Sequence, residues 1–518
     1  MCHGTLNEVN VILITYWKQI VKKIFVKKKK DQGRLINSFP IALDSTKNTS
    51  LHGAHLNELA RKFDGKLLTR REISVNEPMF QFLLAESLFH PTSSIQKSFL
   101  SLPTCQRCNN TKKSLFANIP CARCDESHYY CRKCIAMGRV MECEPLYYWT
   151  GRSYSWPKMI NPCSWTGTLT KAQENAAGKI VDAVSQGEEL LVWAVTGAGK
   201  TEMLFPGITK ALEQGKRVCI ATPRADVVRE LLPRLQQAFA SLHIQGLFSG
   251  SRDNDGTAQL IIATTHQLLR YRHAFDVLII DEIDAFPYHH DASLQFAANR
   301  AKKENASLIY LTATPRDEQR ARIASKKLEH VFVPLRFHGH SLPIPSMIHC
   351  TSITKKLPPQ FLIWIKNRVK RERQLLVFVP TIKLANDLKT PLAELLIAEE
   401  LIFLPSEIEH VHAEDKNREE KILAFRKKKI YALITTTILE RGVTFPSVDV
   451  AVLYAGHQVF DEAALIQISG RAGRSPEDPT GEVIFFHDGQ TNSMVHAVKS
   501  IKQMNRRAEN FKKKKGEK

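Results

Sequence analysis

A glycine-rich segment holds the residues whose types and spacing point most directly to chemistry. Residues 195–201 read Val-Thr-Gly-Ala-Gly-Lys-Thr, and the apolar run Leu190–Ala194 precedes them. A strand, a glycine-rich turn and a helix in this order form a phosphate-binding loop, where backbone N–H groups hold the anion. Lys200 would reach the β- and γ-phosphates of ATP, and the Thr201 hydroxyl would ligate Mg²⁺. The expected nucleotide-binding residues of this loop are Thr196, Gly197, Ala198, Gly199, Lys200 and Thr201.

A second apolar run ends in acidic residues. Val277–Ile280 is followed directly by Asp281 and Glu282, with Asp284 two positions further on. A buried parallel strand delivers such side chains to the ligand edge of its sheet. There Asp281 would bind Mg²⁺ through water, and Glu282 would polarise the attacking water. The pair predicts that a bound nucleotide is hydrolysed.

Seven of the eleven cysteines lie between residues 105 and 143. They form the pairs Cys105/Cys108, Cys121/Cys124 and Cys131/Cys134, with Cys143 standing apart. Two Cys-x-x-Cys pairs complete a tetrahedral Zn²⁺ site, and four thiolates leave no open position for water, so the ion would be structural. Spacing alone accepts Cys121 and Cys124 as readily as the other pairs. A second ion would need Cys143 and either His128 or Cys163, and we expect a single ion.

Short apolar runs rich in β-branched residues alternate with amphipathic helical stretches after Leu169. Continuous apolar strands between helices indicate parallel sheets covered on both faces. The proline- and histidine-rich stretch Pro334–Ile348 interrupts this pattern and is interpreted as a linker. The predicted fold class is α/β, with two parallel-sheet lobes of the P-loop NTPase type. The expected strands are Leu190–Ala194, Val218–Ala221, Leu260–Ala263, Val277–Ile280, Leu308–Leu311, Leu375–Val379, Tyr431–Ile434, Val450–Tyr454 and Val483–Phe486.

The balance of charges favours a polyanionic partner. Lysine and arginine number 73 against 52 acidic residues, a net charge of +21 in 518 residues. Such an excess points to nucleic acid first and to an anionic membrane surface second. No apolar run reaches the length of a membrane span, so we expect a protein inside the cell, with free or metal-bound thiols.

Basic and aromatic residues alternate around the cysteine pairs. Cations that follow a phosphate chain and rings that stack on bases would make this region a grip on DNA. The alternative is that the rings form the small core of a metal-stapled module. The residues in question are Arg107, Lys112, Lys113, Arg123, Arg132, Lys133 and Arg139, with Phe116, Tyr129 and Tyr130.

The order of the motifs resembles that of superfamily 2 helicases and translocases. Residues 169–173 are similar to the element that reads adenine through Gln173, and residues 222–224 and 264–267 are similar to elements that contact a nucleic-acid strand. Residues 311–315 resemble the element that couples hydrolysis to lobe movement, and residues 435–443 resemble motif five. Residues 467–474 resemble motif six, which implies that Gln467, Arg471 and Arg474 complete the catalytic site from the second lobe.

Longer stretches narrow the resemblance to the late competence protein ComFA family. It rests on residues 193–207, 220–224, 264–271 and 130–139, and it extends from about residue 67 to residue 505. The resemblance implies that Zn²⁺ is held by Cys105, Cys108, Cys131 and Cys134, with Cys121 and Cys124 as the alternative pair. It also implies an ATPase of natural transformation, peripheral on the inner face of the cell membrane, that helps to draw one DNA strand through the uptake channel.

We therefore expect an ATP-dependent translocase on single-stranded DNA that works with the uptake channel and other competence proteins, as a monomer or an oligomer. A replication-restart or repair helicase that unwinds duplexes is one alternative, and an RNA helicase is another. A nucleic-acid-binding scaffold clamped by ATP is a third, which Glu282, Arg471 and Arg474 disfavour.

Composition and motifs divide the chain into six segments. We expect a basic, partly disordered arm at 1–60, a small helical region at 61–104 and a four-cysteine zinc module at 105–145. The ATP-binding lobe would span 150–335, the second lobe 345–510, and a basic tail 511–518.

Overall fold

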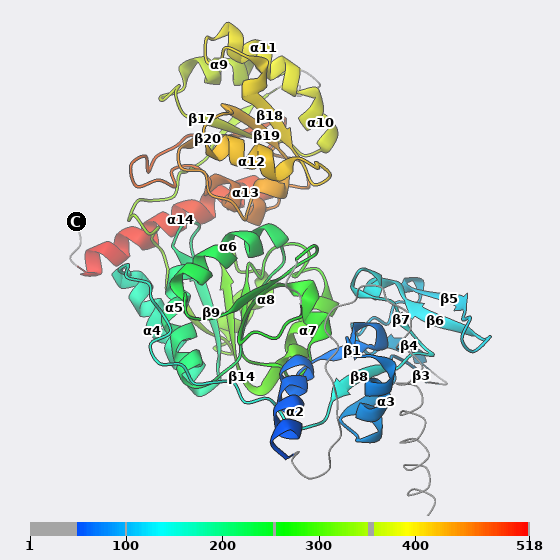
Figure 1. The fold of residues 1–518 in the computed structure, drawn as a ribbon. Helices are drawn as coiled ribbons and strands as arrows, with labels where there is room; N and C mark the ends of the chain where they lie inside the picture. Colours follow the sequence, from blue (N-terminus) through cyan, green and yellow to red (C-terminus); the bar gives the residue numbers. More distant parts are fainter. Residues whose placement is uncertain (1–48, 99–100, 252–254, 351–356, 516–518) are drawn as a thin grey trace, which may run out of the picture. The chain divides into compact units, whose positions relative to one another are not determined.

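A computed structural model describes residues 49–98, 101–251, 255–350 and 357–515 (Figure 1). Residues 56–518 form one compact unit. Of residues 1–55, only those from Thr49 onward, the first residues of helix α2 (Thr49–Phe63), are described. Most of the basic arm and the last residues of the basic tail therefore lie outside the described residues. None of the helices in the described ranges combines the length and the hydropathy that a bilayer crossing requires.

The first lobe is built on a seven-stranded sheet in which every pairing is parallel. Its strands, in spatial order, are β11 (Ile244–Leu247), β12 (Leu260–Thr264), β10 (Val218–Thr222), β13 (Phe275–Asp281), β14 (Lys302–Thr312), β9 (Glu189–Ala194) and β15 (Glu329–Val333). Side chains of α4 (Lys171–Gln186), α5 (Lys200–Glu213) and α6 (Ala225–Ala238) share an apolar cluster with one face of the sheet. The opposite face packs against α7 (Ala292–Ala301) and against the cysteine-bearing region.

The second lobe is built on a six-stranded sheet that is also entirely parallel. Its strands, in spatial order, are β16 (Ser346–His349), β21 (Val483–His487), β20 (Val448–Leu453), β17 (Gln374–Phe378), β19 (Ala432–Thr435) and β18 (Ile408–Val411). One face packs on α9 (Pro359–Asn367), α10 (Ile382–Asp387) and α11 (Lys389–Ala398). The other packs on α12 (Arg418–Arg426), α13 (Glu462–Ser469) and α14 (Asn492–Lys515). The two parallel-sheet lobes confirm the predicted fold class.

All nine expected strands are present, and the two parallel sheets contain four further strands, β11, β15, β16 and β18. These four are the edge strands of the two sheets. Strands β15, β16 and β18 have half-buried or exposed positions, so their sequences need not be continuously apolar, whereas β11 is buried throughout. Strand β16 also overlaps the stretch interpreted as a linker. It was missed because its pairing partner, β21, follows more than one hundred residues later in the chain.

The N-terminal region differs from the small helical region expected at residues 61–104. Helices α2 and α3 (Glu77–Ala85) occur where helices were expected, but β1 (Leu67–Thr69) and β2 (Phe89–Thr92) lie between and after them. Both strands pair antiparallel with β8 (Leu146–Trp149). A small core of Phe63, Phe80, Phe89 and Trp149 joins these elements. The region is therefore mixed α/β, and a distant strand closes it.

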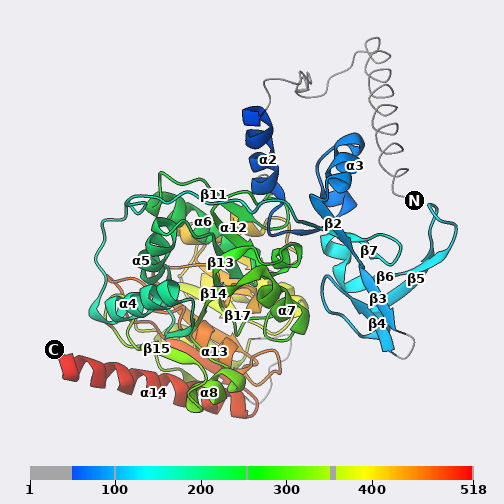
Figure 2. The same cartoon turned by 90° about the horizontal axis from the view of Figure 1, so that it is seen from below.

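The seven clustered cysteines lie on and around two small antiparallel units. Strands β3 (Ile95–Ser98) and β4 (Ser101–Cys105) form a hairpin. Strands β5 (Phe116–Pro120), β6 (Ser127–Cys131) and β7 (Val140–Met141) form a three-stranded sheet. In both views β5 and β6 extend away from the first lobe (Figures 1 and 2).

Candidate functional site

A cavity of about 440 Å³ lies between the two lobes, and predicted site residues line it from both sides. The lining residues from the first lobe include the phosphate-binding loop, Asp281 and Glu282; those from the second include Gln467, Arg471 and Arg474. A larger cavity of about 780 Å³, beside α8 (Asp317–Ala324) and α13, is lined by none of these residues. We place the candidate active site in the smaller cavity because the chemical groups meet there.

The phosphate-binding loop joins β9 to α5. Gly197 and Gly199 have φ angles of 78° and 71°, in the left-handed region that favours glycine. A Cβ atom on Gly199 would also lie 2.4 Å from the Gln173 amide nitrogen. Among the described residues, Lys200 has no hydrogen-bond or ion-pair partner, and the buried Thr196 hydroxyl also lacks one. The loop thus presents polar groups that the folded chain leaves available for an anion.

Gln173 stabilises the phosphate-binding loop by a hydrogen bond to its backbone. Its side-chain oxygen accepts a hydrogen bond from the Thr170 N–H at 2.8 Å, and its amide nitrogen donates to the Ala198 carbonyl at 2.9 Å. It is not among the residues that line the cavity in the described part of the chain. The reading of adenine by Gln173 stays a prediction, which would require the amide to exchange one of these partners for the base.

Asp281 is the last residue of β13 and Glu282 follows it, at the carboxyl-terminal end of the parallel strands. Asp281 accepts the Glu282 N–H at 2.9 Å, and Glu282 has a φ of 55°. Burial raises the pKa of Asp281 to about 6, although the Lys200 ammonium acts in the opposite direction. One carboxylate oxygen of Glu282 is buried without a partner. Carboxylates and hydroxyls are the ligands that Mg²⁺ prefers, so Asp281 and Thr201 fit this ion and its bound waters.

The two arginines of the second lobe are held by backbone carbonyls. Arg471 is buried and donates to the carbonyls of Glu440, at 3.1 Å, and Val443. Arg474 donates to the Gly470 carbonyl at 2.9 Å. Burial, and then the charge of Arg474, lower the pKa of Arg471. Within the described ranges neither guanidinium forms an ion pair with a carboxylate, so both are suited to an anionic ligand.

Arg336 is a buried residue of this site that the sequence did not reveal. It lies in the stretch interpreted as a linker, and its guanidinium donates to the carbonyls of Gly470, Ala472 and Gly473. Its side chain would lie 3.6 Å from a Cβ atom on Gly197, and the next residue, Phe337, donates its N–H to the Gly197 carbonyl at 2.9 Å. Burial lowers the pKa of Arg336 to about 9. The linker therefore contacts the phosphate-binding loop and the arginine segment at once.

A buried carboxylate joins the two lobes beside the cavity. Asp284 accepts hydrogen bonds from the hydroxyls of Thr312, at 2.6 Å, and Thr314, at 2.5 Å. Arg441 of the second lobe donates to the same carboxylate at 2.5 Å. Although burial acts in the opposite direction, Arg441 holds the pKa of Asp284 well below its usual range. Two elements predicted from the sequence, at 311–315 and 435–443, thus both donate hydrogen bonds to the Asp284 carboxylate.

Arg224, in the first predicted strand-contacting element, also points to the second lobe. Its guanidinium donates to Glu440 at 2.8 Å and to the Ile438 carbonyl at 3.1 Å. A contact between this side chain and a nucleic-acid strand stays a prediction.

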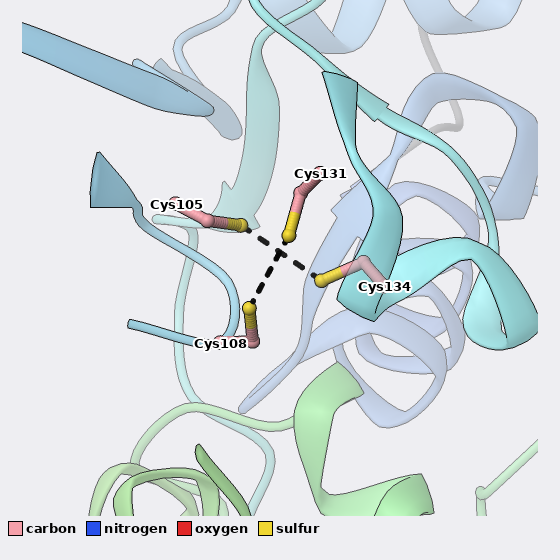
Figure 3. Close-up of side chains that lie close together, drawn as sticks. All are labelled: Cys105, Cys108, Cys131 and Cys134. Atoms are coloured by element: carbon pink, nitrogen blue, oxygen red, sulfur yellow. Dashed lines mark hydrogen bonds between the residues drawn. The ribbon is translucent and has the colours of Figure 1, made fainter. Parts of the chain in front are cut away.

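Four cysteines meet in the candidate metal centre (Figure 3). The sulfur atoms of Cys105, Cys108, Cys131 and Cys134 all lie within 4.8 Å of one another, and all four residues are buried. The Cys105–Cys134 and Cys108–Cys131 separations are 3.8 and 3.6 Å. Zinc–sulfur bonds of about 2.3 Å place the sulfurs of a tetrahedral site about 3.8 Å apart. The thiols therefore fit Zn²⁺, and they are the four that the family resemblance implied.

The surroundings of this cluster remove Arg107 from the candidate DNA grip. Arg107 is fully buried, where it pairs with Glu72 at 2.7 Å and donates to the Leu269 carbonyl of the first lobe. Arg300 of α7 donates to the Gln106 and Arg107 carbonyls, at 3.0 and 2.6 Å. The first cysteine turn is thus docked on the first lobe, and Arg107 is structural.

The aromatic rings and the other cations of this region divide between core and surface. Phe116 is 7% exposed and meets the ring of Tyr129 edge-on, so these two rings follow the core interpretation. Lys133 pairs with Asp291 at 2.7 Å. The basic residues that remain exposed are Lys112, Lys113, Arg123, Arg132 and Arg139.

Three family models match successive parts of the chain. Residues 52–148 match the competence protein ComFA N-terminal domain, residues 166–317 the type III restriction enzyme, res subunit, and residues 357–476 the helicase conserved C-terminal domain. In fold, the chain is similar to Dbp5 of S. cerevisiae bound to RNA and ADP BeF3, with a TM-score of 0.48 and 17% identity over 65% of this chain and 88% of that one. The helicase conserved C-terminal domain and the type III restriction enzyme match together imply an ATP-dependent hydrolase.

Two relatives align with nearly the whole of their own length. The competence protein ComFA of Bacillus subtilis is 44% identical over 453 residues, which cover 86% of this chain and 95% of that protein. The ComFA of Streptococcus pneumoniae is 40% identical over 449 residues, which cover 86% of this chain and 98% of that protein. With this identity over this length, the chain belongs to the competence protein ComFA family.

Proposed function

We propose that the protein is an ATP-driven motor that moves along single-stranded DNA during DNA uptake. The cavity between the lobes carries this proposal. Lys200 and the orphaned Glu282 oxygen stand on one wall, and Arg471 and Arg474, which have no carboxylate partner among the described residues, stand on the other. A nucleotide bound there would touch both lobes, so its hydrolysis would change how the lobes are held together.

The residues of the cavity divide the work of hydrolysis. The loop N–H groups and Lys200 would bind the β- and γ-phosphates, and Glu282 would orient the attacking water. Asp281 and Thr201 would hold Mg²⁺, which when bound neutralises charge on the phosphates. Arg471 and Arg474 would stabilise the charge that develops on the γ-phosphate. Gln467, whose amide nitrogen is buried without a partner, faces the same cavity and would bind the nucleotide or the water.

Two interlobe contacts support a coupling of hydrolysis to movement. Asp284 takes hydrogen bonds from both lobes, and Arg336 spans the phosphate-binding loop and the arginine segment. A phosphate that draws Arg471 and Arg474 toward it would displace the carbonyls that also bind Arg336. Alternate binding and release of the nucleotide would in this way close and open the lobes.

The choice of DNA rests on charge and on the family. The net charge of +21 favours a polyanion, and contacts to the phosphate backbone would give little sequence preference and a steep dependence on salt. Relatives named competence proteins point to DNA uptake. We therefore propose that the motor works on the inner face of the membrane with the uptake channel and other competence proteins. The Cys105 cluster would hold a structural Zn²⁺ beside the first lobe.

Displacement of streptavidin from a biotinylated single strand tests the motor directly. We expect ATP to accelerate the displacement on single-stranded DNA, and we expect little separation of a duplex under the same conditions. Efficient unwinding would favour a repair-type helicase, and displacement from RNA but not from DNA would favour an RNA helicase. ATP turnover that DNA leaves unchanged, with no displacement, would favour a scaffold clamped by ATP.

A further inference from the structure

We propose that the protein holds a second zinc ion, ligated by Cys121, Cys124 and Cys143 with His128 as the fourth ligand. The sulfur atoms of the three cysteines all lie within 4.8 Å of one another, and the Cys121–Cys143 separation is 3.6 Å. The His128 Nε2 atom lies 3.0 Å from the Cys124 sulfur. This set shares no residue with the Cys105 cluster, so the two sets could each hold an ion.

The Cys121 turn repeats the backbone of the Cys105 turn. In the first turn the Cys105 N–H donates to the Asn110 carbonyl at 3.0 Å, and the Asn109 N–H donates to the Cys105 carbonyl at 2.8 Å. In the second, the Cys121 N–H donates to the Glu126 carbonyl and the Asp125 N–H to the Cys121 carbonyl, both at 2.9 Å. Asn109 and Asp125 both adopt the left-handed region, with φ values of 55° and 52°. The chain thus forms the same two-thiol turn twice. In each turn the left-handed residue is the fourth after the first cysteine.

The other two ligands come from strands that the sheet brings to this turn. His128 lies on β6, directly after the turn, and Cys143 follows β7, which pairs with β6. The Tyr129 N–H donates to the Glu142 carboxylate and the Glu142 N–H to the Tyr129 carbonyl, so the residue before Cys143 is fixed beside the residue after His128. The Nδ1 atom of His128 lies 3.8 Å from Glu142. A histidine that ligates zinc through Nε2 usually donates its Nδ1–H to a carboxylate, and Glu142 lies on that side of the ring, just beyond hydrogen-bond distance.

The tip of the β5–β6 hairpin has little else to hold it together. Along β5 the side chains pass from buried Phe116 to exposed Pro120, and along β6 the one fully buried residue is Cys131, at the far end from the tip. The Arg123–Glu144 ion pair, at 2.6 Å, joins the turn to the segment after Cys143, but Arg123 is mostly exposed. An exposed ion pair contributes little to stability, whereas small modules without a core are commonly held by a metal. We infer a structural ion that fastens the tip to the end of β7.

The number of zinc ions per chain tests this inference on the full-length protein. We expect two zinc ions per chain by elemental mass spectrometry, and one after Cys124→Ser or His128→Ala. Cys163→Ser changes a half-buried thiol outside both clusters and should leave two. Cys131→Ser should remove only the ion of the Cys105 cluster. If that variant fails to fold, the zinc counts of the wild type and of Cys124→Ser still show whether a second ion is bound.

Two results would overturn the second site. The first is one zinc ion per wild-type chain that persists in Cys124→Ser, which would leave the Cys105 site in place. The second is a Cys121–Cys143 disulfide in protein alkylated without reductant. The ligand set has its own readout in protein produced with cobalt: the wild-type absorption minus that of Cys124→Ser should be a tetrahedral spectrum with three thiolates and one imidazole. A difference spectrum that His128→Ala leaves unchanged would exclude the histidine.

Discussion

The two walls of the cavity between the lobes differ in how their charged groups are held. On the first-lobe wall, within the described residues, Lys200 has no partner and one Glu282 oxygen is orphaned. On the second-lobe wall, Arg471 and Arg474 are already fixed by backbone carbonyls. A free group can adapt to a ligand, whereas a fixed group acts only where its backbone segment stands. We infer that the first lobe binds the nucleotide and that the second lobe controls the rate of its hydrolysis.

Removal of an arginine from the second wall should therefore have the largest effect on hydrolysis with little effect on binding. For Arg474→Ala we expect a fall in the ATP hydrolysis rate of about 1000-fold or more, because an arginine finger contributes that much to phosphoryl transfer. Fluorescent ATP-analogue binding should change little. Arg426→Ala, an exposed arginine on α12 outside the cavity, is the matched control and should behave as the wild type. Equal losses of binding and hydrolysis would contradict the division between the walls.

On the first wall, Glu282→Gln should slow hydrolysis by about 100-fold or more, the usual contribution of a general base. The variant keeps its size and its Mg²⁺ neighbour Asp281, so ATP binding should remain. Its exposed counterpart Glu304→Gln should leave the rate unchanged. The rate of single-turnover hydrolysis measures the step itself. A normal single-turnover rate in Glu282→Gln would remove this residue from the chemistry.

A smaller effect is expected for Arg336, which joins the two walls. Arg336→Lys keeps a charge but loses the planar fork whose two nitrogens reach the carbonyls of Gly470, Ala472 and Gly473. Changes within a coupling network are typically worth about 0.5–2 kcal/mol, so the stimulation of hydrolysis by DNA should fall by about 2- to 30-fold. The basal rate should fall less than the stimulated rate. A loss confined to the thermal stability, with stimulation intact, would mean that Arg336 only supports the fold.

The smallest effect is expected for Gln173, behind the first wall. Gln173→Ala removes two hydrogen bonds that brace the loop, each worth about 0.5–1.5 kcal/mol. Because the Gln173 side chain hydrogen-bonds to the loop and does not line the cavity, we expect the rates of ATP and GTP hydrolysis to fall by the same factor. The ratio of kcat/KM for the two nucleotides checks this, and a loss confined to ATP would support a direct reading of adenine instead.

Local patterns in the sequence predicted the centre of each sheet but not its edges. The expected strands are continuously apolar because two neighbours and two layers of helices cover them. Edge strands such as β15 and β16 have exposed and half-buried positions and include histidines. Strand β8 pairs with β1 and β2 although more than fifty residues of sequence separate it from them, and no local sequence pattern predicts such a pairing.

The same division runs through the candidate site. The phosphate-binding loop and the Asp281–Glu282 pair are contiguous motifs, so their positions at the sheet edge could be predicted. Arg336 and the Asp284–Arg441 contact could not, because each depends on segments far apart in the chain that only the folded lobes bring together. For the cysteines, spacing indicated the pairs, but only the pairing of β6 with β7 shows that Cys143 meets Cys121 and Cys124.

The rate of ATP hydrolysis, measured side by side without nucleic acid and with single-stranded DNA, duplex DNA and RNA, tests the central claim most directly. For the wild type we expect single-stranded DNA to stimulate hydrolysis most. For Lys200→Ala, with an unchanged thermal melt, we expect no hydrolysis with any polymer. Hydrolysis by Lys200→Ala at the wild-type rate would contradict the placement of the nucleotide between the lobes.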